Sequence, residues 1–150
     1  QQLHIVYEAG PTGFGLQRSP VLSVDCRQRI QRVIRELTEG QGIETSVRLS
    51  GPMSVITGGL ADHSEAVVIE AVSNALRHSG ASRLTVGVDV NDDIVIVIND
   101  DGHGIPADNQ RRSGLANLHR RAEQVGGRCE ITEPPGGGVR VRWSAPLGMP

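Results

Sequence analysis

Aromatic side chains are nearly absent from this chain of 150 residues, and their scarcity limits its possible partners. Tyr7, Phe14 and Trp143 are the only residues of these three types. Proteins that hold single-stranded nucleic acid stack bases on such rings, and nucleic-acid binders in general carry a basic face. With so few rings and a formal net charge of −2, the sequence predicts no nucleic-acid partner.

Cysteines and long apolar runs are also scarce. The two cysteines, Cys26 and Cys129, fall in no metal-binding spacing. A disulfide between them is one interpretation, but two buried thiols in a reducing cytosol are the favoured one. No apolar run approaches the length of a membrane-spanning helix, and no signal peptide is visible. We therefore expect a cytoplasmic domain without membrane contact, and because residue 1 is Gln rather than Met, we expect a piece of a longer protein.

The first part of the chain predicts a linker followed by a helix and a strand. Glycine and proline interrupt residues 1–19, which favours a linker, and a single domain is expected over 20–150. Ser19-Pro20 is typical of a helix start, and apolar residues at helical spacing continue to about Glu39, before Gly40. A strand is predicted at 45–49.

The rest of the chain predicts two more helices and four more strands. The second helix begins at Asp62, which forms a capping-box pair with Glu65, and continues to His78 before Ser79-Gly80 ends it. It is apolar over most of its girth, so we expect it to be buried. The remaining expected elements are strands at 84–90 and 94–98, a loop at 99–113, a helix at 114–125, and a hairpin of 128–132 with 139–144. Together they predict an α+β fold of two layers, a sheet with helices on one face.

A carboxylate and an amide, Glu70 and Asn74, lie four residues apart on the second predicted helix and therefore share a face. Arg77 and His78 continue that face by one turn. An ordinary solvent-facing stripe is one interpretation. The other is a magnesium and phosphate site, because Asn is disfavoured inside helices and an amide oxygen suits Mg²⁺, which takes few protein ligands beside phosphate and water.

Asp100, Gly102 and Gly104 follow a continuous apolar strand. Asp-Gly favours turns, so a strand-ending turn is one interpretation. A carboxylate at a strand end can also accept a hydrogen bond from the exocyclic amine of a base, and the glycines permit close approach of a ligand. Read together with Glu70 and Asn74, this loop suggests a nucleotide site.

Three further segments allow both a structural and a nucleotide-binding interpretation. Ser113-Gly114-Leu115 opens the third predicted helix, whose free amide groups are either simply capped or bind a phosphate. Arg111 and Arg112 could reach phosphates or be solvated. The glycines at 136–138 are most simply part of a hairpin turn.

Taken together, these motifs resemble one family. The set comprises Glu70-x-x-x-Asn74, Asp100-x-Gly102-x-Gly104, Gly114-Leu115-x-x-Leu118-x-x-Arg121 and Gly126-Gly127. It is similar to the catalytic ATP-binding domain (HATPase_c) of sensor histidine kinases, which belongs to the GHKL superfamily with gyrase B and MutL. Residues 70–81 look like the N-box of the branch that contains the nitrate sensor NarX and the thermosensor DesK. Residues 142–146 and the overall spacing look closest to the mycobacterial heme-based gas sensors of the DosS and DosT type, and the resemblance covers about 20–146.

The resemblance implies a Bergerat ATP-binding fold, which is a two-layer α/β sandwich with a mixed sheet, and it implies ATP and Mg²⁺ as cofactors. It implies Asn74 on Mg²⁺, Glu70 as the polarising or basic catalytic carboxylate, and Asp100 on the adenine amino group. The other nucleotide-binding residues that it implies are Arg77, His78, Gly102, Gly104, Gly114 and Leu115.

The resemblance also implies an activity for the whole protein. The γ-phosphoryl group of ATP would pass to a histidine on the protein's own dimerisation domain and then to a response regulator. Residues 1–19 would be a linker or the end of that domain, and heme would belong only to a sensor domain outside this chain. None of the five histidines is followed by Asp or Glu, so the phosphoacceptor signature is absent and this fragment alone is not expected to autophosphorylate. The alternatives are a non-kinase GHKL-type switch or slow ATPase, and a structural domain with a degenerate pocket.

The chain departs from the family's pattern in four places. Val139 stands where a threonine usually follows the last glycine, Asp101 replaces the common Asn, and Arg120 replaces the common Glu beside Arg121. The segment between Gly104 and Gly114 has nine residues, which is short for the loop that covers ATP in this family. The short loop and the missing hydroxyl at Val139 predict weak nucleotide binding by the isolated domain.

Overall fold

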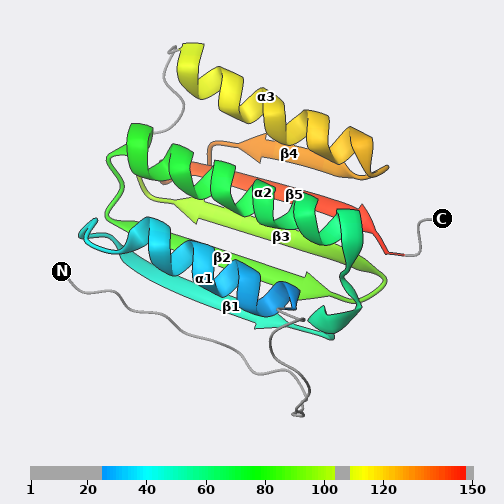
Figure 1. Cartoon of the computed structure of the whole chain (residues 1–150). Helices are drawn as coiled ribbons and strands as arrows, with labels where there is room; N and C mark the ends of the chain where they lie inside the picture. The colour runs from blue at the N-terminus through cyan, green and yellow to red at the C-terminus, as the bar shows by residue number, and fades with distance from the viewer. Residues whose placement is uncertain (1–24, 104–108, 148–150) are drawn as a thin grey trace.

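The computed structural model describes residues 25–103 and 109–147, and in this part of the chain helices cover one face of a mixed sheet (Figure 1). The five strands lie in the order β1-β2-β3-β5-β4, with β1 parallel to β2 and the other neighbours antiparallel. The strands are β1 (Glu44–Ser50), β2 (Arg83–Val90), β3 (Asp93–Asp100), β4 (Arg128–Thr132) and β5 (Val139–Pro146). The α-helices are α1 (Cys26–Thr38), α2 (Gly58–Asn74) and α3 (Asn109–Gln124). The predicted two-layer α+β sandwich is confirmed.

The alternation of buried and partly exposed residues along the strands explains why helices cover one face of the sheet. In β3, Ile94, Ile96 and Ile98 are buried while the residues between them are partly exposed. Side chains alternate between the two faces of a strand, so this pattern directs one row of each strand toward the helices. Trp143 of β5 is wholly buried there, and its Nε1 donates to the carbonyl oxygen of Leu118 in α3 at 3.2 Å. A buried indole needs such an acceptor, and the bond fixes α3 over β5.

The predicted starts of the first two helices are wrong. Ser19-Pro20 lies outside the described residues, and α1 begins at Cys26, where Asp25 is the N-cap and its Oδ1 accepts from the Gln28 amide at 3.0 Å. Helix α2 begins at Gly58, after the 3₁₀ turn η1 (Met53–Val55). Asp62 therefore lies in the second turn of α2, where backbone amides already bond within the helix, and it cannot act as a cap.

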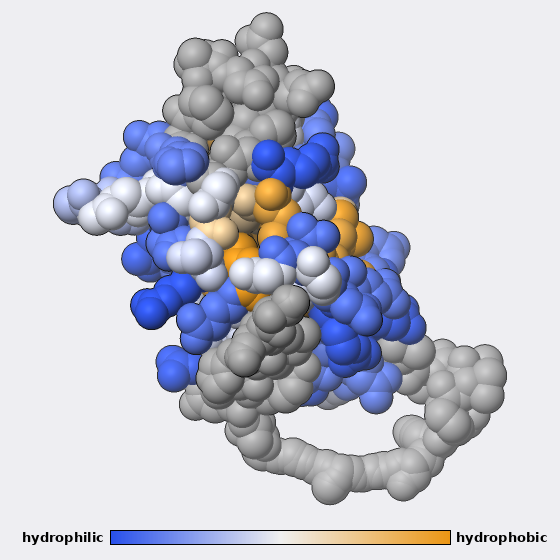
Figure 2. Space-filling model, turned by 90° about the vertical axis from the view of Figure 1, so that its left-hand side faces the viewer, coloured by the Kyte–Doolittle hydropathy of each residue, from blue (hydrophilic) through white to orange (hydrophobic). Residues whose placement is uncertain are grey.

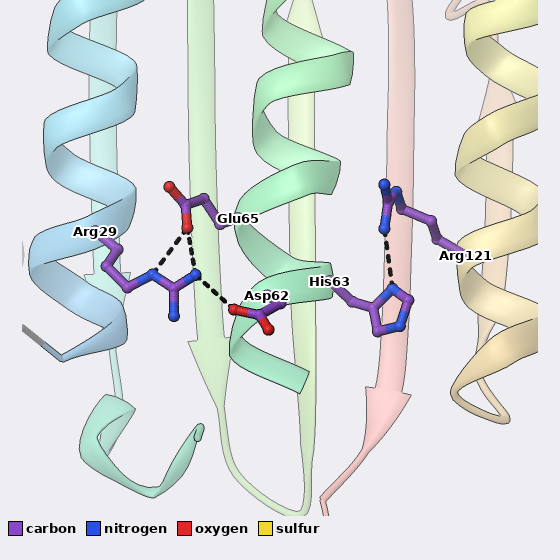
Figure 3. A network of polar contacts seen from close by, with 5 residues as sticks. All are labelled: Arg29, Asp62, His63, Glu65 and Arg121. Carbon is purple, nitrogen blue, oxygen red and sulfur yellow. Dashed lines mark hydrogen bonds and ion pairs between the residues drawn. The ribbon is translucent and has the colours of Figure 1, made fainter. Parts of the chain in front are cut away.

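Asp62 and Glu65 instead join α2 to α1 (Figure 3). Arg29 of α1 donates from Nη2 to Asp62 Oδ1 at 2.8 Å and from Nε to Glu65 Oε1 at 2.8 Å. Its Nη2 also contacts the same oxygen of Glu65. One arginine thus holds two carboxylates of the neighbouring helix.

Helix α3 also begins earlier than predicted. It starts at Asn109 rather than at Gly114, so the predicted loop over 99–113 is shorter than expected. At the other end, Gly126 has φ +73° and the Gly127 amide donates to the Ala122 carbonyl at 2.8 Å, which is the glycine-dependent helix end that the sequence predicted. In Figure 1, α2 and α3 run in opposite directions over the sheet.

The two cysteines are free thiols. Cys26 is buried in α1, above the β1 side of the sheet, and Cys129 lies on β4 at the opposite edge (Figure 1). The disulfide interpretation is therefore wrong. In the described part of the chain, no helix combines the length and apolar character needed to cross a bilayer.

Candidate nucleotide site

Four segments of the candidate site meet at one end of the sheet. The end of α2, the end of β3, the turn between β4 and β5 and the beginning of α3 all lie at the left of Figure 1. Figure 2 looks onto this end and shows apolar residues in the centre with polar residues around them. An apolar centre with a polar rim is typical of small-molecule sites.

Glu70 and Asn74 contact α3 at Gly114. A Cβ atom at Gly114 would lie 2.5 Å from Glu70 Oε2, 2.6 Å from Asn74 Nδ2 and 2.9 Å from Asn74 Oδ1. The α3 backbone therefore packs directly on both polar side chains, and a side chain at position 114 would have to displace one of them or the helix. Two motifs some forty residues apart in the sequence thus lie together, and Asn74 is only 3% exposed. The interpretation of Asn74 as part of a solvent-facing stripe is wrong.

The face that carries Asn74 does not continue as predicted. After Asn74 the helix widens into a π-helical turn, η2 (Ala75–Ser79), and ends at Gly80 with φ +66°. Arg77 is exposed although Asn74 is buried, because the wider turn changes the angular spacing of the residues that follow. The side chain of His78 lies outside the described part. Single π turns occur often at functional sites.

Asp100 ends β3 and is 9% exposed. Its Oδ1 accepts from the Gly102 amide at 2.9 Å, so the strand-ending turn that Asp-Gly favours is present. The β4–β5 turn lies against this segment, since a Cβ atom at Gly138 would be 1.9 Å from the Asp100 carbonyl oxygen. The turn is thereby part of the candidate site. Gly104 lies outside the described residues.

Asp101, the departure from the family's Asn, holds the beginning of β2. Its Oδ1 accepts from the amides of Ser82 at 2.8 Å and Arg83 at 2.9 Å, and its Oδ2 accepts from Ser82 Oγ at 2.9 Å. Burial raises the pKa of this carboxyl, but the hydrogen bonds from Arg83 and Ser82 outweigh burial and leave the pKa below its ordinary value. The extra charge thus has a structural partner in the chain itself.

The predicted position of the third helix's N-terminus is wrong. Because α3 begins at Asn109, the amides of Gly114 and Leu115 lie inside the helix rather than at its N-terminus. Leu115 is 8% exposed and belongs to the core. A contact between His103 and Gly80 was not predicted from the sequence. A Cβ atom at Gly80 would lie 2.8 Å from His103 Nε2. That contact joins the loop after β3 to the end of the α2–η2 helix, and a glycine at a helix end was its only sequence signal.

The donors at this end suit a nucleotide with Mg²⁺. Among the described residues, no group of three or more His, Cys, Asp or Glu side chains could hold a metal ion. Mg²⁺ does not need such a group, because it binds through one or two protein oxygens together with phosphates and water. The amide of Asn74, the carboxylate of Glu70 and a glycine backbone packed on both fit that requirement.

Comparisons with known proteins identify the class. Residues 59–149 match the family described as histidine kinase-, DNA gyrase B- and HSP90-like ATPase. The chain belongs to this family. It is 31% identical over 128 residues to the sensor protein VraS of Staphylococcus aureus (strain COL) and 30% identical over 128 residues to VraS of Staphylococcus epidermidis. Each alignment covers 76% of this chain and 37% of the relative, so the chain spans little more than a third of these relatives.

Solved structures share the fold. The ATP-binding domain of PrrB from Mycobacterium tuberculosis has a TM-score of 0.62 at 23% identity, over 84% of this chain and 96% of that one. The Acinetobacter baumannii histidine kinase AdeS has a TM-score of 0.67 at 19% identity, over 83% of this chain and 66% of that one. The predicted histidine-kinase type of ATP-binding fold is confirmed.

Proposed function

We propose that this chain is the ATP-binding catalytic domain of a sensor histidine kinase. In the whole protein it would position Mg-ATP so that the γ-phosphoryl group passes to a histidine on a separate dimerisation domain and then to a response regulator. The observation that carries the proposal is the contact of Glu70 and Asn74 with Gly114, beside the turn at Asp100. Family membership and the similarity to sensor proteins support it.

The proposed roles follow the chemistry of each group. Asn74 offers its amide oxygen to Mg²⁺. Glu70, beside Asn74, acts as the polarising or basic carboxylate of the phosphoryl transfer. Asp100 accepts from the adenine amine. Bound Mg-ATP supplies the phosphoryl group and its charge neutralisation, while the protein supplies position, which is most of what this reaction requires. The other proposed nucleotide contacts are Arg77, His78, Gly102, Gly104, Gly114 and Leu115.

Two narrower assignments belong to the proposal. We place the chain in the NarX and DesK-like branch, nearest to the mycobacterial heme-based gas sensors, on the motif at 70–81 and the tail at 142–146. Heme would then lie in a sensor domain outside this chain, and this domain would work in the cytoplasm. The family also includes gyrase-like and HSP90-like ATPases, so a non-kinase ATP-dependent switch is the second candidate.

Titration calorimetry with Mg-ATP tests the binding site. Asn74→Ala should lose magnesium-dependent binding while its circular dichroism spectrum stays native. The matched control is Asn117→Ala on α3. Asn117 Oδ1 accepts a hydrogen bond from Arg120 Nη1 at 2.6 Å on the protein surface, and the control variant should bind Mg-ATP as the wild type does. Equal binding by Asn74→Ala and the wild type would remove Asn74 from the site.

A longer chain that includes the dimerisation domain separates the two candidate functions. A kinase leaves acid-labile phosphate on a histidine after incubation with labelled ATP. Release of phosphate without any phosphohistidine would instead identify the switch or ATPase.

A further inference from the structure

A second polar contact joins α2 to α3, two turns away from Glu70 (Figure 3). Arg121 Nη1 of α3 lies 3.2 Å from His63 Nδ1 of α2. A guanidinium group can only donate hydrogen bonds, so His63 Nδ1 is the acceptor in this contact. Both side chains are partly buried.

This contact and the contact at Gly114 lie along one interface between α2 and α3, which we call the seam; it contains His63 and Glu70 of α2 and Gly114 and Arg121 of α3. His63 and Glu70 are seven positions apart on α2, and Gly114 and Arg121 are seven positions apart on α3. Seven residues are about two helical turns, so both contacts lie on the same face of each helix. Val67 and Leu118 lie between them in sequence, and both are fully buried. Because the helices run antiparallel, the pairs His63–Arg121 and Glu70–Gly114 lie two turns apart along the same interface between α2 and α3.

The seam covers the proposed magnesium ligand. Gly114 packs on Asn74, which is only 3% exposed, whereas a metal ion must reach the amide oxygen. Helix α3 is continuous from Asn109 to Gln124, so a movement that lifts the whole helix takes Gly114 away from Asn74 and Arg121 away from His63 together.

We propose that His63 is a positioning residue for the nucleotide site. Through Arg121 it holds α3 over Glu70 and Asn74, and Mg-ATP must displace α3 to reach Asn74. This inference rests on the proposed function of Asn74. A contact present only in the covered arrangement lowers the apparent affinity for a ligand that needs the uncovered one.

The other side of α2 shows which element moves. Arg29 holds Asp62 and Glu65 to α1 at the same end of the helix. Residues 62 and 63 are adjacent but point to opposite neighbours in Figure 3, so α2 is held to α1 through Asp62 and to α3 through His63. The contact with α1 uses two carboxylates and the contact with α3 one ring nitrogen, so we assign the displacement to α3, against its bond to Trp143 of β5.

The test measures Mg-ATP affinity by calorimetry in a set of variants. His63→Ala and Arg121→Ala should each tighten binding by about two- to tenfold, the range that corresponds to one ordinary hydrogen bond. The double variant should add nothing further, because either change alone breaks the contact. His63→Asn keeps an acceptor near the position of Nδ1 and should restore wild-type affinity. Arg29→Ala, the matched control on the other side of α2, should lower thermal stability without changing affinity.

Several outcomes would overturn the inference. Unchanged or weaker binding by His63→Ala means that the contact does not hold a covered site, and additive effects in the double variant mean that the two residues act separately. Hydrogen exchange without nucleotide provides a measurement independent of ATP: His63→Ala should raise exchange along 115–124, and unchanged exchange there refutes the positioning role. If the wild type binds no Mg-ATP while exchange responds as expected, the proposed function fails but the contact between the helices stands.

Discussion

Replacing Gly114 by alanine tests the closest contact in the candidate site. The new Cβ atom would lie 2.5 Å from Glu70 Oε2 and 2.6 Å from Asn74 Nδ2, which is well inside van der Waals contact. Glu70 is only half-buried and can turn away. Asn74 is 3% exposed and is enclosed by its neighbours, so α3 itself must move.

Two opposing effects set the magnitude. Alanine is favoured over glycine inside a helix by about 1 kcal/mol. Inserting a methyl group into a packed region costs about 1–3 kcal/mol, and the upper part of this range applies because the clash involves two atoms of an enclosed amide. The clash therefore exceeds the helix preference, and we expect a net loss of about 1–2 kcal/mol in the free energy of unfolding.

Gly59→Ala is the matched control. Gly59 lies in the first turn of α2, and a Cβ atom there would meet nothing within 4 Å. The same substitution should stabilise the protein by up to about 1 kcal/mol through helix preference and a less disordered unfolded state. Urea unfolding of the three proteins with equal m-values gives the comparison. The reasoning is refuted if Gly114→Ala is as stable as the wild type while Gly59→Ala gains the expected amount.

Three further predictions concern the base, the phosphoryl group and the thiols. Asp100→Asn keeps an acceptor for the Gly102 amide but removes the charge that accepts from adenine, so competition binding should show a smaller preference for ATP over GTP; an unchanged preference argues against base reading by Asp100. The isolated chain incubated with labelled ATP should carry no acid-labile phosphate, and label on it would show that this chain contains a phosphoacceptor histidine. Burial raises the pKa of Cys26 and of Cys129 to about 11, so at pH 8 only roughly 0.1% of each is thiolate and alkylation in the native state should be far slower than in guanidinium. Equal alkylation rates in the native state and in guanidinium would show that the thiols are not protected. Because the pKa values of the two thiols are raised in the folded state, the stability that the protonated thiols contribute is lost as the pH rises from about 8.5 toward 11.

The sheet and the central part of the site could be predicted because both depend on local pattern. Alternating apolar residues fixed which face of β2 and β3 is covered, and the helical spacing of Glu70 and Asn74 was sufficient to place them together. The family resemblance placed this pair and Gly114 around one nucleotide, but their direct contact was not predicted. Long-range packing of that kind has no local signal.

Helix ends were the main failure, since packing decides them. Asp62 and Glu65 have the spacing of a capping box, but the same spacing places two carboxylates on one side of a helix, within reach of Arg29. Which interpretation holds depends on where α2 begins. That point is set by the 3₁₀ turn whose Met53 is buried in the core, a tertiary contact that the pattern at 62–65 does not contain.

The π turn after Asn74 explains why a correct motif gave an incorrect face. The sequence from Glu70 to His78 fits an α-helix throughout, so Arg77 was expected beside Asn74. Widening of the helix over Ala75–Ser79 leaves Arg77 exposed while Asn74 stays buried. An i to i+5 bond changes no residue type and leaves no periodicity of its own in five residues, so it can be found only in the structure.

The glycines of the site need a different argument from its polar side chains. At Gly138 a Cβ atom would lie 1.9 Å from the Asp100 carbonyl oxygen, and at Gly114 it would meet Glu70 and Asn74. Chain packing alone therefore requires glycine at both positions, whether or not a nucleotide binds. A loss of ATP binding in a glycine variant could thus arise from displaced segments rather than from a lost ligand contact. Asp100→Asn reduces this ambiguity because it preserves the shape of the side chain, and Asn74→Ala inserts no atom that would displace α3, so these two variants identify the ligand better than a glycine variant does.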